Sequence, residues 1–259
     1  MSRGSGGTPG AGGRASRGAA GTGGDLPKFS FFVTSIGAMK RLSKSQNGFG
    51  GDLRYGEATG LAGADKICTE IAEVSMAGSG AKGWRAFLST TKGGTNDGPV
   101  DAIDRIGMGP WYDRLGRTVA LTKADLMYPR PQGADPAIAN DLPNEDGIPN
   151  HQDGAPGCTG DACPDNHDIL TGTYLNGGGH TTNLRATCQD WTSAVGSDGQ
   201  PHCGHSWPRG VKESWISSIT EAGCAPGINL VEMGGPDANN PTVGSGGGYG
   251  GIYCFALSP

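Results

Sequence analysis

An acidic loop at residues 142–153 carries oxygen ligands of the kind that calcium prefers. Counted from Leu142, Asn144 and Asp146 fall at the third and fifth places of a twelve-residue calcium loop, and Asp153 falls at the twelfth. Leu142 stands where Asp is expected, and the twelfth residue is Asp instead of Glu, so the segment departs from the EF-hand pattern. We predict calcium ligands at Asn144, Asp146 and Asp153, with a solvated acidic loop as the alternative.

A second group of possible ligands surrounds Cys158 and Cys163, which have His151 and His167 on either side. Cysteine and histidine at short separations can hold zinc. The alternative is a local disulfide, which the neighbouring glycines and prolines favour because they suit a tight closed loop. We therefore predict a Cys158–Cys163 disulfide.

The seventh cysteine, Cys203, lies between His202 and His205. An odd cysteine indicates a free thiol, an intermolecular bridge or an alternative pairing. The histidines also allow a metal cluster here.

Two tryptophans, Trp207 and Trp215, flank a loop that contains glycine and proline. An exposed aromatic ring beside polar side chains is what a sugar ring stacks on. We predict ligand binding by Trp207, Trp215, His205 and Asp190, and ordinary core packing is the alternative.

The sequence contains no recognisable catalytic motif. The glycines of residues 246–251 match GxGxxG, but they precede a C-terminal strand and do not open a helix, which excludes a dinucleotide fingerprint. Neither GxSxG nor HExxH occurs. We expect no enzymatic activity.

The apolar pattern predicts one main helix and several short strands that position these loops. From residue 57 to 77, apolar residues that include Cys68 recur every three or four positions, which indicates an amphipathic helix. Aromatic and β-branched runs predict strands at 29–35, 84–89, 169–173, 188–192 and 214–217, a hairpin over 111–121, and a last strand around Cys254. This order is typical of an α+β domain.

Composition divides the chain into a tail and one domain. Its 259 residues include 49 Gly and 17 Pro, so loops take up much of the chain. Residues 1–25 have almost no apolar side chains and are expected to be disordered. The domain is predicted over 26–259, with residues 129–168 as a long acidic loop insertion.

Several short motifs, in this order, resemble bacterial exported lectin-like domains of the C-type lectin fold, a group that is also similar to endostatin. The motifs are Phe32-Val33-Thr34-Ser35, Gly63-Ala64-Asp65-Lys66-Ile67-Cys68, Trp84-Arg85-Ala86-Phe87-Leu88-Ser89, Leu170-Thr171-Gly172-Thr173, Cys188-Gln189-Asp190-Trp191-Thr192 and Tyr253-Cys254-Phe255. The resemblance covers roughly residues 28–257 and implies a C-type lectin-like fold with one main N-terminal helix, short mostly antiparallel strands and long Gly/Asp-rich loops.

The resemblance also implies two nested disulfides, Cys68–Cys254 outside and Cys188–Cys224 inside. Sugar-binding members of the group use calcium with a Glu-Pro-Asn or Gln-Pro-Asp triplet and a Trp-Asn-Asp triplet. This chain has none of these triplets, and Asp190-Trp191-Thr192 is the nearest match. The resemblance therefore implies the fold more strongly than it implies the usual calcium site.

We expect an extracytoplasmic domain that binds a carbohydrate or a surface protein, with calcium as a possible cofactor. A structural or adhesion module without a small ligand is the alternative, and an enzyme that uses a reactive Cys203 is a third hypothesis. Disulfides indicate an oxidising compartment, although residues 1–25 show no signal peptide. No run of 18 apolar residues spans a membrane, and a net charge of −5 without a basic stripe argues against nucleic acid.

Overall fold

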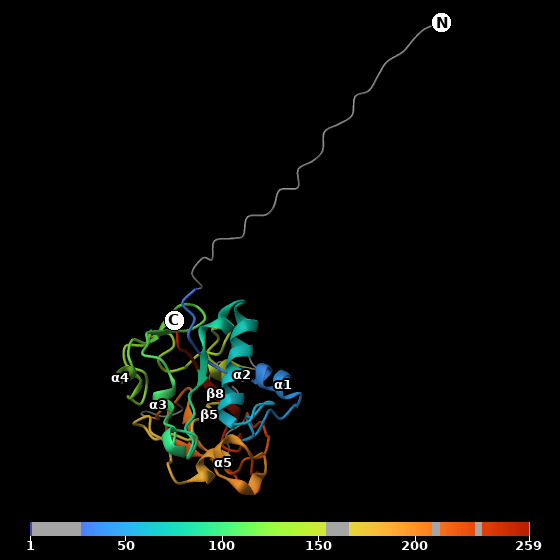
Figure 1. The fold of residues 1–259 in the computed structure, drawn as a ribbon, viewed down its shortest axis with the longest axis vertical. Helices are drawn as coiled ribbons and strands as arrows, with labels where there is room; N and C mark the ends of the chain where they lie inside the picture. Colours follow the sequence, from blue (N-terminus) through green and yellow to red (C-terminus); the bar gives the residue numbers. More distant parts are fainter. Residues whose placement is uncertain (2–26, 154–165, 209–212, 231–234, 259) are drawn as a thin grey trace.

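The computed structural model describes residue 1 and residues 27–153, 166–208, 213–230 and 235–258. These residues form a mixed α/β structure with few helices and small sheets, in agreement with the predicted α+β class (Figure 1). No helix among them is long and apolar enough to cross a membrane.

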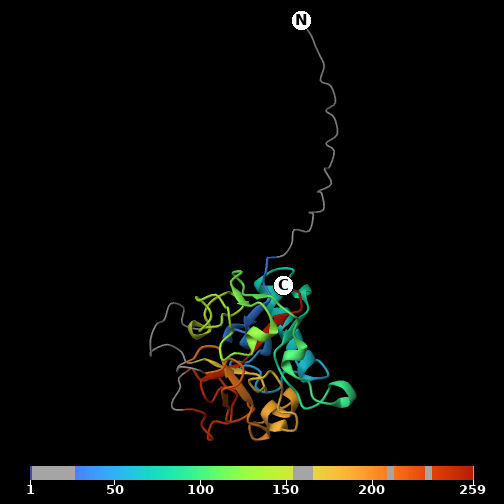
Figure 2. The same ribbon diagram turned by 90° about the vertical axis from the view of Figure 1, so that its left-hand side faces the viewer.

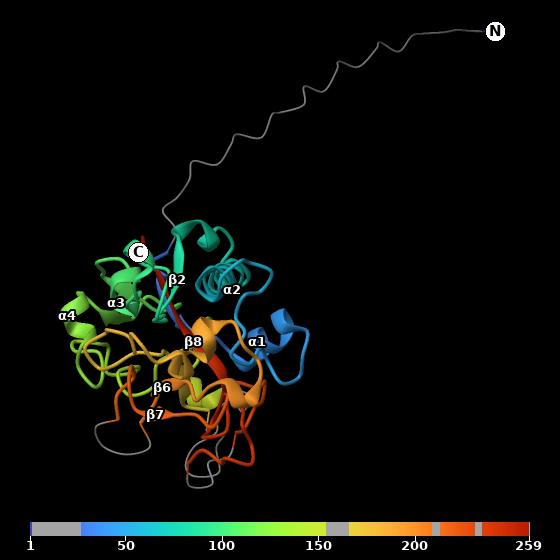
Figure 3. The same ribbon diagram turned by 60° about the horizontal axis from the view of Figure 1, so that its bottom comes forward.

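The main sheet is built on its C-terminal strand. Its strands are β1 (Phe31–Val33), β2 (Trp84–Ala86), β5 (Asp168–Leu170), β6 (His202–His205), β7 (Ile219–Thr220) and β8 (Gly248–Ala256). β8 pairs antiparallel with β1 and β2 and parallel with β5, and β6 and β7 extend the sheet from β5 in antiparallel order. Every residue of β8 is buried, and Figure 3 shows this strand crossing the middle of the molecule.

Short helices and a hairpin surround the sheet. The helices are α1 (Ile36–Ser43), α2 (Gly60–Ser75), α3 (Ala102–Arg105), α4 (Lys123–Leu126) and α5 (Cys188–Trp191), and the hairpin pairs β3 (Trp111–Tyr112) with β4 (Thr118–Ala120). Long connections fill the rest of the surface, as Figure 2 shows from the side.

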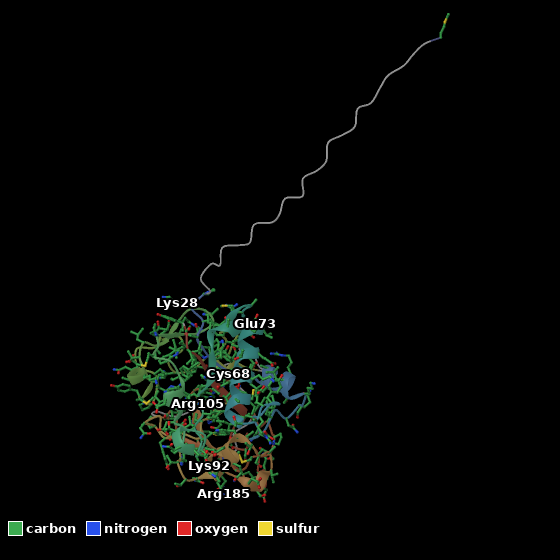
Figure 4. All side chains as sticks on the ribbon, viewed as in Figure 1. Lys28, Cys68, Glu73, Lys92, Arg105 and Arg185 are labelled. Carbon is green, nitrogen blue, oxygen red and sulfur yellow. A yellow bond between two sulfur atoms is a disulfide. The ribbon has the colours of Figure 1, made fainter. Side chains whose placement is uncertain are left out.

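α2 is the main helix that the sequence predicts. The Thr59 side chain caps it by accepting a hydrogen bond from the Ala62 amide at 3.2 Å. Its buried face includes Ile67, Cys68 and Ile71, which pack into the core. In Figure 4 Cys68 lies in the interior, between Glu73 and Lys28 toward one end of the molecule and Arg185 and Lys92 toward the other.

Both disulfides implied by the resemblance are confirmed. Cys68 of α2 is bonded to Cys254 of β8, and Cys188 is bonded to Cys224. The first pair spans 186 positions of sequence and therefore connects the helix to the end of the domain. Cys158 and Cys163 lie outside the described residues.

Two predicted strands are wrong, and a helix was missed. Residues 188–192 form a tight turn in which Cys188, Gln189, Asp190 and Trp191 all have positive φ, and residues 214–217 form bends. α1 occupies a segment that the sequence pattern left as loop. Local alternation could not reveal the turn, because the hydrogen bonds and disulfide that hold it come from distant residues.

Helical glycines should respond to alanine in opposite directions, according to the space around them. A Cβ on Gly63 in α2 would lie 2.0 Å from the Arg54 carbonyl oxygen, whereas a Cβ on Gly37 in α1 would meet nothing closer than 3.9 Å. We expect Gly63→Ala to lower the free energy of unfolding by about 2 kcal/mol, because the backbone must move. Gly37→Ala should raise it by about 0.5–1 kcal/mol through helix propensity. Urea denaturation measures both, and equal effects would contradict the packing argument.

Candidate functional site around Trp207 and His205

The pairing of β5 with β6 places an aspartate opposite a histidine. The antiparallel register sets Asp168 directly across from His205, so their side chains share one face of the sheet. His167, the residue before β5, approaches the same point. The strand register, and not sequence proximity, therefore brings His205 to this site.

The three side chains form a compact buried cluster. Asp168 Oδ1 lies 2.9 Å from His205 Nε2 and 3.4 Å from His167 Nε2. The two imidazole rings meet edge to face, with their centroids 4.2 Å apart. Among the described residues, no other set of three His, Cys, Asp or Glu side chains brings its ligand atoms within 4.8 Å of one another.

The hydrogen bonds of this cluster are incomplete. Asp168 is fully buried, and among the described residues its carboxylate accepts no hydrogen bond from an amide, hydroxyl or imidazole group, although a protonated Glu221 can donate to it. His205 Nε2 has no hydrogen-bond partner either, so its 2.9 Å contact with Asp168 is close without the alignment of a hydrogen bond. A buried carboxylate without a donor is destabilising.

Glu213 determines the orientation of His205. The Glu213 Oε2 atom lies 2.7 Å from His205 Nδ1. A carboxylate can only accept, so the ring donates from Nδ1. In the neutral ring, Nε2 then carries a lone pair that faces the Asp168 carboxylate. Two acceptors facing each other call for a proton or a cation between them.

Two more ionisable groups lie near Asp168, and each has a raised pKa that favours its neutral form. Burial, together with the Asp168 carboxylate, raises the pKa of Glu221 well above its ordinary value. Glu221 Oε2 accepts a hydrogen bond from the Gly246 amide at 2.8 Å, whereas Oε1 has no partner. Burial, Glu221 and Asp168 also raise the pKa of the Cys203 thiol.

Trp207 covers the cluster from the loop that follows β6. Its ring centroid lies 5.8 Å from that of His167 and 5.4 Å from that of His151, both at steep angles. The indole is partly exposed, and its N–H is shielded without an acceptor. His151 in turn contacts Asp141 through Nδ1. Two of the five histidines, His151 and His167, therefore contact one indole ring.

A half-buried arginine, Arg130, holds the backbone that leads to Trp207. The Arg130 guanidinium donates to the carbonyl oxygens of His205 at 2.7 Å and Ser206 at 2.5 Å. It also donates to the Ala139 carbonyl at 3.0 Å and so ties the long loop to β6. The predicted loop insertion is thus packed against the site over its described part.

Of the four predicted ligand-binding residues, the structure brings together Trp207 and His205. Trp215 is fully buried, and its indole N–H donates to the Leu126 carbonyl at 2.9 Å, so its ring is not exposed as sugar stacking requires. The alternative, ordinary core packing, describes Trp215 correctly.

The hydrogen bonds of Asp190 indicate a structural role. Its carboxylate accepts hydrogen bonds from the Thr91 amide at 2.7 Å, the Thr91 hydroxyl at 2.8 Å and the Thr187 hydroxyl at 3.0 Å. These contacts stabilise the left-handed turn that contains Asp190.

The predicted calcium ligands are engaged by the protein or exposed. Asn144 Oδ1 accepts from the amides of Asp146 and Ile148 at 3.0 and 3.1 Å, and Asp153 Oδ2 accepts from the Ile36 amide at 2.6 Å. Asp146 is exposed. Over its described part the loop is ordered by turns and by the N-terminus of α1.

His151 and His167 were predicted only as possible zinc ligands together with Cys158 and Cys163, and Asp168 was not grouped with His205. The usable signal was the His-Asp pair at the start of one strand and the histidine at the end of the next, but the register could not be read from the sequence. No protein-family model matches this chain, and no curated protein shows significant similarity to it.

Proposed function

We propose that this protein is an extracytoplasmic ligand-binding domain of the C-type lectin-like fold, and that a carbohydrate binds against Trp207. The observation that carries the proposal is the partly exposed Trp207 ring between His151 and His167. A sugar stacks its apolar face on such a ring and exchanges hydrogen bonds at its edges.

The arrangement of the chain ends supports the fold assignment. β1 pairs with β8, so the first and last strands of the domain lie side by side, and the outer disulfide joins the main helix to β8. The inner disulfide holds the turn at Cys188 within that frame. The nested order is the one that the resemblance implies.

The two disulfides support the extracytoplasmic location, because cytosolic thiols are kept reduced. The environment of Cys203 argues against the third hypothesis, an enzyme in which this cysteine is the nucleophile. It is buried, and its pKa is raised. Reactive cysteines have the opposite environment, with a lowered pKa and solvent access.

A glycan array tests the proposed function with the full chain and two matched variants. We expect the wild type to bind a defined set of glycans and Trp207→Ala to weaken that binding about tenfold or more, the equivalent of about 1.4 kcal/mol. Tyr174→Ala is the control, since it removes another exposed aromatic ring, which stacks on His180 instead. Equal losses in both variants would contradict a site at Trp207.

The same array separates the alternatives. A folded protein that binds no glycan supports a structural or adhesion module. Repeating the array with calcium and with a chelator tests the calcium assistance that Asn144, Asp146 and Asp153 predict.

A further inference from the structure

We propose that His167, Asp168 and His205 form a binding site for a divalent transition ion of the zinc class, which bridges β5 and β6 beneath Trp207. The inference does not depend on sugar binding. The proposed ligands also differ from the predicted calcium ligands Asn144, Asp146 and Asp153.

The distances match tetrahedral zinc coordination. Zinc bonds of about 2.0–2.1 Å place neighbouring ligand atoms roughly 3.3 Å apart. Asp168 Oδ1 lies 2.9 Å from His205 Nε2 and 3.4 Å from His167 Nε2, and all three ligand atoms fall within 4.8 Å of one another. Small adjustments of these side chains therefore suffice for coordination.

The hydrogen bonds indicate that a positive charge belongs among these atoms. Among the described residues the fully buried Asp168 accepts no hydrogen bond from an amide, hydroxyl or imidazole group, and His205 Nε2 lacks a hydrogen-bond partner although it faces that carboxylate. His205 donates from Nδ1 to Glu213, which leaves the Nε2 lone pair directed at the site. A cation satisfies both acceptors at once.

The ligand types select the class of metal. Two imidazole nitrogens and one carboxylate form a common zinc set, and a fourth position remains for water or another oxygen ligand. Calcium instead takes six to eight oxygen ligands, which this cluster does not provide. Glu213 occupies the position of the carboxylate that commonly orients a metal-binding histidine.

Metal analysis and thermal melting of the purified full chain test the site. We expect about one zinc per chain, and a rise in Tm of roughly 5 °C or more when zinc is added to chelator-treated protein. Calcium should not reproduce this rise. Absence of bound zinc together with a Tm that added zinc leaves unchanged would overturn the proposal.

Asp168→Asn separates a metal site from a simple ion pair between Asp168 and protonated His205. The amide keeps the shape of the carboxylate and can donate to His205 Nε2. If the cluster binds zinc, the variant loses the zinc and the zinc-dependent Tm rise, and without metal it melts no lower than chelator-treated wild type. If the cluster is an ion pair, the variant melts lower than the wild type whether zinc is present or removed, which would overturn the proposal.

Two further variants complete the design. Glu213→Gln should weaken zinc affinity about 10- to 100-fold while the stoichiometry at saturating zinc stays unchanged, since Glu213 positions His205 without touching the ion. His180→Ala is the control, because it removes a partly exposed histidine that does not belong to the cluster. If His180→Ala lost zinc as Asp168→Asn does, the assignment of ligands would be wrong.

Discussion

Replacing Cys68 and Cys254 together with alanine should lower the free energy of unfolding by about 5 kcal/mol. The bond between them closes a loop of 186 positions. On the chain-entropy model, the conformational entropy that a disulfide removes from the unfolded chain increases with the length of the loop it closes. The change is comparable to the whole stability of many domains. Urea denaturation under oxidising conditions, with the other disulfide intact, measures it.

Matched variants separate the crosslink from the loss of buried sulfur. Alanine at Cys188 and Cys224 opens a shorter loop of 36 positions and should cost about 4 kcal/mol. Cys203→Ala removes a buried thiol that forms no disulfide and should cost about 1 kcal/mol. If the outer pair cost no more than Cys203→Ala, the outer disulfide would not be the main covalent support of the domain.

Glu145→Gln should remove the part of the pH dependence of stability that Glu145 contributes in the wild type between about pH 4.5 and pH 7. Burial raises the pKa of Glu145 from 4.5 to about 7, although hydrogen bonds from Ser35 act in the opposite direction. A carboxyl whose pKa is raised on folding contributes stability that is complete below its unfolded pKa and is lost as pH rises through its folded pKa. The free energy of unfolding should therefore fall by about 3 kcal/mol across this range.

Urea denaturation at several pH values from 4.5 to 8 tests this expectation. Glutamine should fit the site, because its oxygen can accept from the Ser35 amide, which lies 2.9 Å from Oε2, and its NH2 group can donate to the Ser35 hydroxyl, which lies 2.6 Å from Oε1. Asp97→Asn is the control, since that carboxylate is exposed and does not contribute to the pKa shift of Glu145. If Glu145→Gln retained the wild-type slope, Glu145 would not be the group that titrates.

The frame of the fold could be predicted from the sequence where the signal is local and repeated. The apolar spacing around Cys68 predicted α2, and the aromatic runs predicted β1, β2 and the hairpin of β3 and β4. Each of these elements buries one of its faces, so apolar residues recur along it at the regular spacing of a helix or a strand.

The site was less predictable because its members come from separate elements. His205 and Trp207 were predicted, but for a ligand and not as neighbours of Asp168. Trp215 looked like a surface residue because glycine and proline precede it, yet the sheet and α4 enclose it. Burial of a single side chain depends on what packs over it, and a short local pattern does not record that.

By itself the sequence determined the α+β class, the main helix and, through a resemblance, the pairing of four cysteines. Only the tertiary structure decided that Asp168 meets His205, since one residue of slip between β5 and β6 would turn these two side chains to opposite faces. The tertiary structure also shows that the side chains of Asn144 and Asp153 accept hydrogen bonds from backbone amides. Contacts between distant segments set the charge and burial of each group, and they place the candidate site between β5 and β6.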